Sequence, residues 1–144
     1  MLRTVLTAAL VTLGATVVVA QDPIAARKEL MKGVGAQARN GAQMVRGEQP
    51  FELAKAQTVF KVFQDAGEKF PAMFPENSKT GGDTAALPAI WTNMPDFKAK
   101  SDKLAADAKA AQASVKDLET FKTAFGGIGR DCGACHETYR AKRN

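Results

Sequence analysis

Apolar residues recur at helical intervals along most of this chain, and the most regular series lies near its C-terminal end. There the spacing alternates between three and four residues without a break, as in a helix that packs along one apolar seam. The series predicts a helix over about 116–142, and both cysteines of the chain fall within its seam. The seam residues are Leu118, Phe121, Phe125, Ile128, Cys132, Cys135 and Tyr139.

The same periodicity predicts a first helix over about 23–46. Asp22 is a favourable N-cap, and Pro23 suits the first helical position because that position needs no backbone N–H. Gly47 follows the stretch and fits a helix end, where glycine adopts a positive φ without strain. These residues predict both ends of the first helix.

Two more helices are predicted between these stretches. One covers about 51–70 and stops at Pro71, and the other covers about 95–113. Residues 74–87 are rich in Gly, Pro, Asn and Asp and predict a loop, while 87–91 predicts a short helical turn. Four helices with two short connections and one long connection predict an all-α fold, an antiparallel up-down-up-down four-helix bundle.

The first twenty residues have the pattern of an export signal. Arg3 precedes a mostly apolar run over 5–19, and the run ends in residues that suit a cleavage site. We expect residues 1–20 to be a secretory signal peptide and residues 21–144 to form one periplasmic domain without a membrane span. An uncleaved anchor is the alternative, but polar residues interrupt the run, which is shorter than the roughly 18–20 apolar residues that a span needs.

Composition argues against several classes of function. The chain has 20 basic and 15 acidic residues, a net charge of +5, and Arg3 is the only charge that the signal peptide would remove. This mild excess favours acidic partners, whereas the scarcity of aromatic residues argues against nucleic acid. The acidic residues are scattered over faces expected to be solvated. With one histidine, no Ser/His pair and no phosphate-binding loop, the chain is not expected to be an enzyme.

The candidate chemistry lies in the segment CGACH at 132–136, which holds both cysteines and the only histidine. C-x-x-C-H is the attachment signature of a c-type haem. Cys132 and Cys135 are three residues apart, so on a helix their thiols share a face and can form thioethers with the two vinyl groups of one porphyrin. His136 can then reach the iron as its proximal ligand. We therefore expect one covalent haem c.

Other interpretations of the cysteine pair are weaker. A disulfide between the two cysteines would close only a very small loop. A redox-active dithiol is expected in a strand–helix–strand context, which this chain lacks. A zinc site would have only three soft ligands here and no second histidine.

A second axial ligand would have to come from upstream, because no methionine or histidine follows the motif. In an up-down-up-down bundle, the end of the fourth helix lies beside the start of the first, which places Met31 at about the level of His136. Met44 lies about 20 Å further along the first helix and is excluded. Met73 and Met94 flank the long loop at the same end and stay open as alternatives.

The state of Met31 decides the expected function. A methionine sulfur bound to the iron raises its potential and makes an electron carrier, whereas a methionine that only covers the iron leaves a five-coordinate site for a small gas. The leading hypothesis is a periplasmic electron carrier with His136 and Met31 as axial ligands, which exchanges electrons with redox partner proteins. The alternative is a five-coordinate haem protein that binds nitric oxide or carbon monoxide.

Four segments match one family: ARKELMK at 26–32, PFELAKAQ at 50–57, LPAIW at 87–91 and, most specifically, CGACHETYR at 132–140. Over its whole mature part the chain resembles the class II c-type cytochromes, the group of cytochrome c prime and cytochrome c-556. The resemblance implies a four-helix bundle with haem bound near the C-terminus. It also implies thioethers at Cys132 and Cys135 and a proximal ligand at His136.

The resemblance implies roles for three further residues. Met31 lies at the distal position, where the c-556 type has a ligating methionine and the c prime type an apolar residue that does not bind the iron. Arg27, four residues earlier, also suits the c prime type, and Arg140 matches a basic residue near the proximal face. Both arginines are therefore expected near the haem. The resemblance also allows a homodimer through the first two helices.

Overall fold

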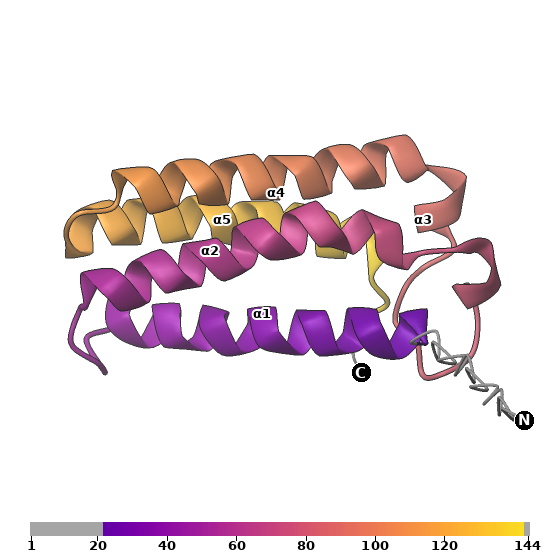
Figure 1. The fold of residues 1–144 in the computed structure, drawn as a ribbon, viewed down its shortest axis with the longest axis horizontal. Helices are drawn as coiled ribbons and strands as arrows, with labels where there is room; N and C mark the ends of the chain where they lie inside the picture. Colours follow the sequence, from indigo (N-terminus) through magenta and orange to yellow (C-terminus); the bar gives the residue numbers. More distant parts are fainter. Residues whose placement is uncertain (1–21, 143–144) are drawn as a thin grey trace, which may run out of the picture.

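Four long helices lie side by side in the computed structural model, which describes residues 22–142 (Figure 1). They are α1 (Pro23–Val45), α2 (Leu53–Lys69), α4 (Met94–Ser114) and α5 (Leu118–Tyr139). Successive long helices run in opposite directions, so the start of α1 and the end of α5 lie at the same end of the bundle. The predicted all-α, up-down-up-down bundle is confirmed.

The connections have the predicted character. Short segments join α1 to α2 and α4 to α5. The long connection between α2 and α4 contains two 3-10 helices, η1 (Phe70–Met73) and η2 (Glu76–Ser78), and the short helix α3 (Ala89–Thr92). α3 is the helical turn expected at 87–91. This connection covers the end of the bundle where α1 begins and α5 ends.

The expected export signal at 1–20 lies outside the described residues. Within residues 22–142, none of the helices combines the length and the apolarity needed to cross a bilayer.

Local signals at the ends of α1 act as predicted. The side chain of Asp22 accepts a hydrogen bond from the Ile24 N–H at 3.0 Å, which satisfies one of the free donors at the helix start. Gly47 has a φ of +73°, a conformation that glycine reaches without strain. At the start of α5, Asp117 and Thr120 form a reciprocal capping box, which helical periodicity does not predict.

The end of α5 differs from the expectation. The predicted helix continues to about 142, but α5 ends at Tyr139 because the next residues pair with the long connection. The Leu87 N–H donates to the Tyr139 carbonyl oxygen at 3.0 Å, and the Ala141 N–H donates to the Ala85 carbonyl oxygen at 2.8 Å. These bonds pull the chain into an extended conformation and tie the C-terminal segment to the rest of the bundle.

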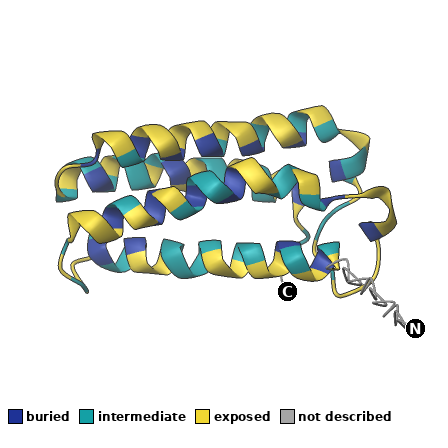
Figure 2. Ribbon diagram, in the orientation of Figure 1, coloured by how far each residue is buried: buried dark blue, intermediate teal, exposed yellow. Residues whose placement is uncertain are grey.

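Buried residues recur along the long helices (Figure 2), and the buried apolar side chains form two clusters inside the bundle. The first cluster fills the middle of the bundle and the end away from the long connection, and the second lies beneath that connection. α5 contributes buried side chains to both clusters. The buried members of the first are Met44, Ala56, Val59, Phe60, Phe63, Ala108, Ala111, Val115, Phe121 and Ile128, and those of the second are Phe74, Ile90, Phe97 and Tyr139.

Two glycines allow helices to approach closely. A Cβ on Gly67 of α2 would lie 2.7 Å from the Ser101 carbonyl oxygen of α4. A Cβ on Gly41 of α1 would lie 2.3 Å from the ring of Phe125 of α5. Both distances are too short for real carbon contacts. These glycines therefore mark where α2 meets α4 and where α1 meets α5.

Candidate cofactor site

Cys132, Cys135 and His136 lie on the last two turns of α5, and all three are half-buried. Both cysteines are free thiols. Cys132 packs against the first apolar cluster and Cys135 against the second. The motif thus lies where the two clusters meet, with apolar side chains on either side that suit a porphyrin ring.

Burial shapes the protonation of these groups. Burial raises the pKa of the Cys132 thiol, and the charge of Asp131 adds to this effect. Burial also raises the pKa of the Cys135 thiol, with a contribution from Cys132. Burial, and after it the charge of Arg140, lowers the pKa of His136. A lowered pKa favours the neutral imidazole, which has a ring nitrogen free to bind a metal ion.

Glycines form a stripe along α5 that leads to His136. Gly126, Gly129, Gly133 and His136 follow one another at steps of three, four and three, which places them on one side of the helix. A Cβ added to any of the three glycines would meet no atom within 4 Å. The helix surface beside the imidazole is therefore flat and open. Together with the two thiols and the apolar flanks, this surface fits a haem.

Met31 lies on α1 at about the level of His136 on α5. The contact between Gly41 and Phe125 gives a common reference point. From that contact, Met31 is ten residues toward the start of α1, about 15 Å, and His136 is eleven residues toward the end of α5, about 16 Å. Because the two helices run antiparallel, both displacements lead to the same end of the bundle.

The other methionines have different surroundings. Met44 is 1% exposed and lies inside the first cluster. Met73 and Met94 pack against the second cluster, at the end of the bundle that holds the motif. Among the methionines of residues 22–142, Met31 alone belongs to neither cluster. It is half-buried.

Arg27, expected near the haem, is buried against the long connection. Its guanidinium donates to the carbonyl oxygens of Met73 and Ser78 at 3.4 and 2.9 Å. It also donates to the hydroxyl oxygens of Ser78 and Thr84 at 2.9 and 2.6 Å. The guanidinium carbon lies 4.7 Å from the centre of the Phe74 ring. Arg27 therefore ties the start of α1 to the connection that covers this end of the bundle.

Arg140, also expected near the haem, is the exposed residue that follows α5. Its backbone pairs with Ala86 of the long connection. Its charge reaches His136, one turn earlier, and contributes to the lowered pKa of that imidazole. The positive charge of Arg140 therefore acts on the motif histidine, at the end of the bundle that holds the motif.

Asp131 corrects the expectation that the carboxylates lie on solvated faces. Its side chain is only 10% exposed, because it lies between α4 and α5, where Lys103 of α4 donates to its Oδ1 at 2.8 Å. Its position directly before Cys132 was the one available signal in the sequence. Its partner lies 28 residues away, and only the packing of α4 against α5 brings the two together.

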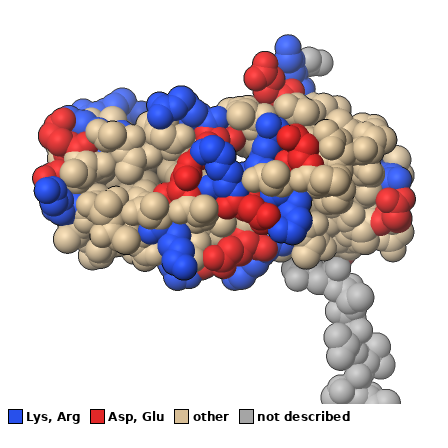
Figure 3. Space-filling model, turned by 90° about the horizontal axis from the view of Figure 1, so that it is seen from above, with Lys and Arg blue, Asp and Glu red and all other residues tan. Residues whose placement is uncertain are grey.

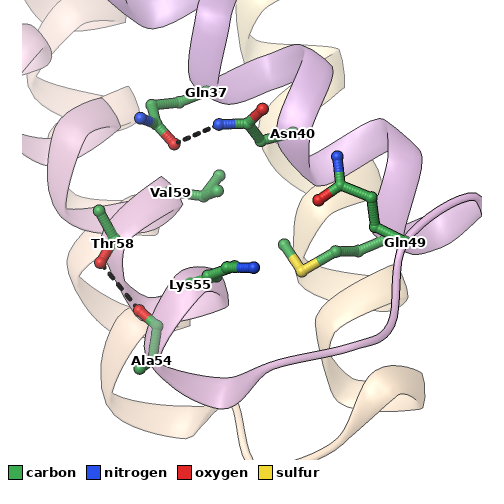
Figure 4. Close-up of a pocket in the computed structure, with 8 residues that line it drawn as sticks. Gln37, Asn40, Gln49, Ala54, Lys55, Thr58 and Val59 are labelled. Atoms are coloured by element: carbon green, nitrogen blue, oxygen red, sulfur yellow. Dashed lines mark hydrogen bonds between the residues drawn. The ribbon is translucent and has the colours of Figure 1, made fainter.

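A groove lies elsewhere, between α1 and α2 at the opposite end of the bundle (Figure 4). Three apolar side chains, three amides, one hydroxyl and one ammonium group line it. Of the candidate residues named above, only the excluded Met44 is among them. It is therefore separate from the motif. The lining residues are Gln37, Asn40, Met44, Gln49, Ala54, Lys55, Thr58 and Val59.

Comparisons with known proteins identify the family of the chain. The family model described as Cytochrome C' matches residues 22–140. A cytochrome c' of Rhodopseudomonas palustris is 44% identical over 144 residues, 99% of either chain. A cytochrome c-556 of Agrobacterium fabrum is 39% identical over 127 residues, which cover 88% of this chain and 86% of that protein. The solved structure of a R. palustris cytochrome c' matches with a TM-score of 0.84 and 42% identity, over 87% of this chain and 100% of that chain.

The family match includes the whole cysteine–histidine motif and nearly all described residues. The cofactor is therefore haem c, and the dithiol and zinc interpretations of the cysteine pair are set aside. The chain belongs to the cytochrome c' family, whose members are electron-carrying proteins with a covalently attached haem c.

Proposed function

We propose that this chain is a periplasmic electron carrier that holds one haem c between α1 and α5. Cys132 and Cys135 form the two thioethers, His136 is the proximal iron ligand, and Met31 is the distal ligand. When bound, the haem supplies a one-electron ferric–ferrous couple. The chain attaches the group, offers its axial ligands and shields it from water. The observation that carries this proposal is the matched level of Met31 and His136 on antiparallel helices.

The neighbours of Met31 on α1 support an inward direction for its side chain. Arg27 lies four residues before it and Ala38 seven residues after it, so all three share a face of the helix. Arg27 is 4% exposed, and Ala38 packs against the first cluster. With a buried residue before it and a partly buried residue after it on the same face, the thioether of Met31 is available to a group between α1 and α5.

We further infer that residues 1–20 direct the chain to the periplasm and are removed after Ala20. Attachment of haem to two thiols outside the cytoplasm agrees with export, and redox partner proteins there would exchange electrons with it. N-terminal sequencing of the protein from a periplasmic extract should begin at Gln21. A mature protein that still begins at Met1 would contradict the cleavage.

The optical spectrum of the purified protein tests the axial ligands. The wild type should show a low-spin, six-coordinate spectrum, and Met31→Ala should convert it to a high-spin spectrum because the sulfur ligand is lost. Met73→Ala and Met94→Ala are matched controls at the same end of the bundle and should leave the spectrum unchanged. A high-spin ferrous spectrum in the wild type, or a low-spin spectrum that survives in Met31→Ala, contradicts the proposed ligation.

A five-coordinate gas-binding protein is the second candidate. The higher identity to a relative named cytochrome c', 44% against 39% for one named cytochrome c-556, favours it. In that case Met31 covers the iron without binding it. The wild type would then be high-spin, would bind carbon monoxide or nitric oxide readily, and would change little on Met31→Ala.

Haem attachment is tested separately from ligation. Haem should stay with the wild-type protein through acid–acetone extraction and should be extracted from a Cys132→Ala/Cys135→Ala double variant. His136→Ala should keep the covalent haem but lose the normal spectrum, because only the proximal ligand is removed. Retention of haem by the double variant, or a normal spectrum in His136→Ala, would refute the corresponding role.

A further inference from the structure

Asp131 is a buried carboxylate beside the attachment motif, and the proposed ligation does not use it. Its side chain is 10% exposed. Oδ1 accepts a hydrogen bond from Lys103, whereas Oδ2 is buried and has no hydrogen-bond partner among the described residues. A buried carboxylate oxygen without a donor is costly, and such groups are often kept for a functional reason.

The charge of Asp131 is only partly neutralised by its neighbours. Lys103 shares its ammonium group between Asp131 and Asp107, so one cation serves two carboxylates. The side chains of Lys103 and Asp107 are 60% and 48% exposed. Basic and acidic groups lie close together on the surface seen in Figure 3. Water screens charges at that surface, but it screens the buried Asp131 much less. Lys103, Asp107 and Asp131 together carry a net negative charge. The least screened of these charges, that of Asp131, lies at the motif.

The field of Asp131 reaches the haem attachment point. Asp131 precedes Cys132 directly, and its charge is one of the causes of the raised pKa of that thiol. His136 follows Asp131 by five residues, about 7.5 Å along the helix axis. Inside a protein, two unit charges at such a separation interact strongly enough to shift a redox equilibrium measurably.

We propose that Asp131 lowers the reduction potential of the haem bound at Cys132. The oxidised iron carries one more positive charge than the reduced iron, so a nearby carboxylate stabilises the oxidised form more strongly. Lys103 moderates this effect from α4. The inference rests on the proposed attachment of haem through Cys132, and it holds whether or not Met31 binds the iron.

A purely structural role is the alternative, because the bond between Lys103 and Asp131 also joins α4 to α5. The reduction potential and the thermal midpoint separate the two roles. Three variants suffice: Asp131→Asn removes the buried charge and keeps the shape, Lys103→Gln removes the moderating cation, and Asp107→Asn removes the exposed carboxylate on the same lysine.

The three haem-loaded variants should differ in how their reduction potentials shift from that of the wild type. Asp131→Asn should raise the potential by about 59 mV, which is a tenfold change in the one-electron equilibrium. Lys103→Gln should lower it, because Asp131 is then left without its cation. Asp107→Asn should change it little. The Asp131→Asn shift should persist at high salt, whereas shifts from surface charges decline.

Potentials that are equal in Asp131→Asn and Asp107→Asn, or higher in Lys103→Gln than in the wild type, would overturn the proposal. If Asp131→Asn does not fold, the predicted lower potential of Lys103→Gln still tests it. Acid–acetone extraction of the wild type and of each variant distinguishes a failure of the proposed haem attachment from a failure of the proposed role of Asp131. Haem that is extracted from the wild type refutes the attachment at Cys132, and retained haem with unchanged potentials refutes the role of Asp131.

Discussion

At the scale of single residues, Arg27 shows how this bundle holds a buried charge. Its side chain is 4% exposed, and its hydrogen-bond partners are neutral carbonyl and hydroxyl oxygens. Burying a cation is unfavourable unless such bonds replace its water. The flat guanidinium can satisfy several acceptors at once and also stack on Phe74, which a lysine ammonium cannot do equally well.

Arg27→Ala should therefore destabilise the protein by on the order of 3 kcal/mol, because it removes these bonds and leaves the carbonyl and hydroxyl oxygens of Ser78 without a donor. Arg27→Lys should recover part of the loss. Denaturant unfolding of the haem-loaded protein measures both. Arg39→Ala, an exposed arginine on the same helix, is the control and should cost less than about 0.5 kcal/mol. Equal losses at Arg27 and Arg39 would contradict this account.

At the scale of helices, the bundle is built from pairs that approach at small residues. Gly67 of α2 lies against backbone atoms of α4, namely the carbonyl oxygen of Ser101 and the nitrogen of Ala105. The Ser101 hydroxyl also donates to the Gly67 carbonyl oxygen at 3.0 Å. A backbone contact of this kind cannot yield by a side-chain rotation, so the spacing of α2 and α4 depends on the absence of a Cβ.

Gly67→Ala should destabilise the protein by about 1–3 kcal/mol, because the added methyl forces α2 and α4 apart. Gly33→Ala is the matched control, since a Cβ there meets no atom within 4 Å on an exposed helical surface. It should stabilise the protein by about 0.5–1 kcal/mol through helix propensity. Thermal and denaturant unfolding check both signs, and a stabilising Gly67→Ala would show that the helices can separate without cost.

At the scale of the whole molecule, the apolar interior is divided into two clusters. Cys132 packs against one cluster and Cys135 against the other, while Met31 belongs to neither. The proposed haem would therefore contact both clusters and the inner face of α1. A group in that position contributes a large share of the apolar surface buried in a chain of this size.

The protein without haem should consequently be poorly folded. A Cys132→Ala/Cys135→Ala double variant purified without haem should unfold over a broad temperature range and show weak near-ultraviolet circular dichroism, because side-chain packing is lost before helix content. Calorimetry and circular dichroism against the haem-loaded wild type measure the difference. A melt of the double variant that is as sharp and as high as that of the wild type would contradict this prediction.

Local chemistry explains which parts of the fold were predictable. Asp22 and Gly47 mark the ends of α1 through bonds and angles that involve only neighbouring residues. The end of α5 was predicted three residues too late, because Arg140 and Ala141 pair with residues more than fifty positions upstream. Helical periodicity carries no information about a strand-like pairing partner from another part of the chain.

The sequence by itself determined the four helices, their order, and the cysteine–histidine motif with its cofactor class, because spacing along one helix sets which side chains share a face. It also singled out Met31, since the rise per residue converts sequence number into a level in the bundle. Only the tertiary structure decided where Arg27 and Asp131 lie. The partners of Arg27 lie on the long connection, and the partner of Asp131 lies on α4. These groups meet only when the helices pack, so spacing along the chain does not show where the two buried charges lie.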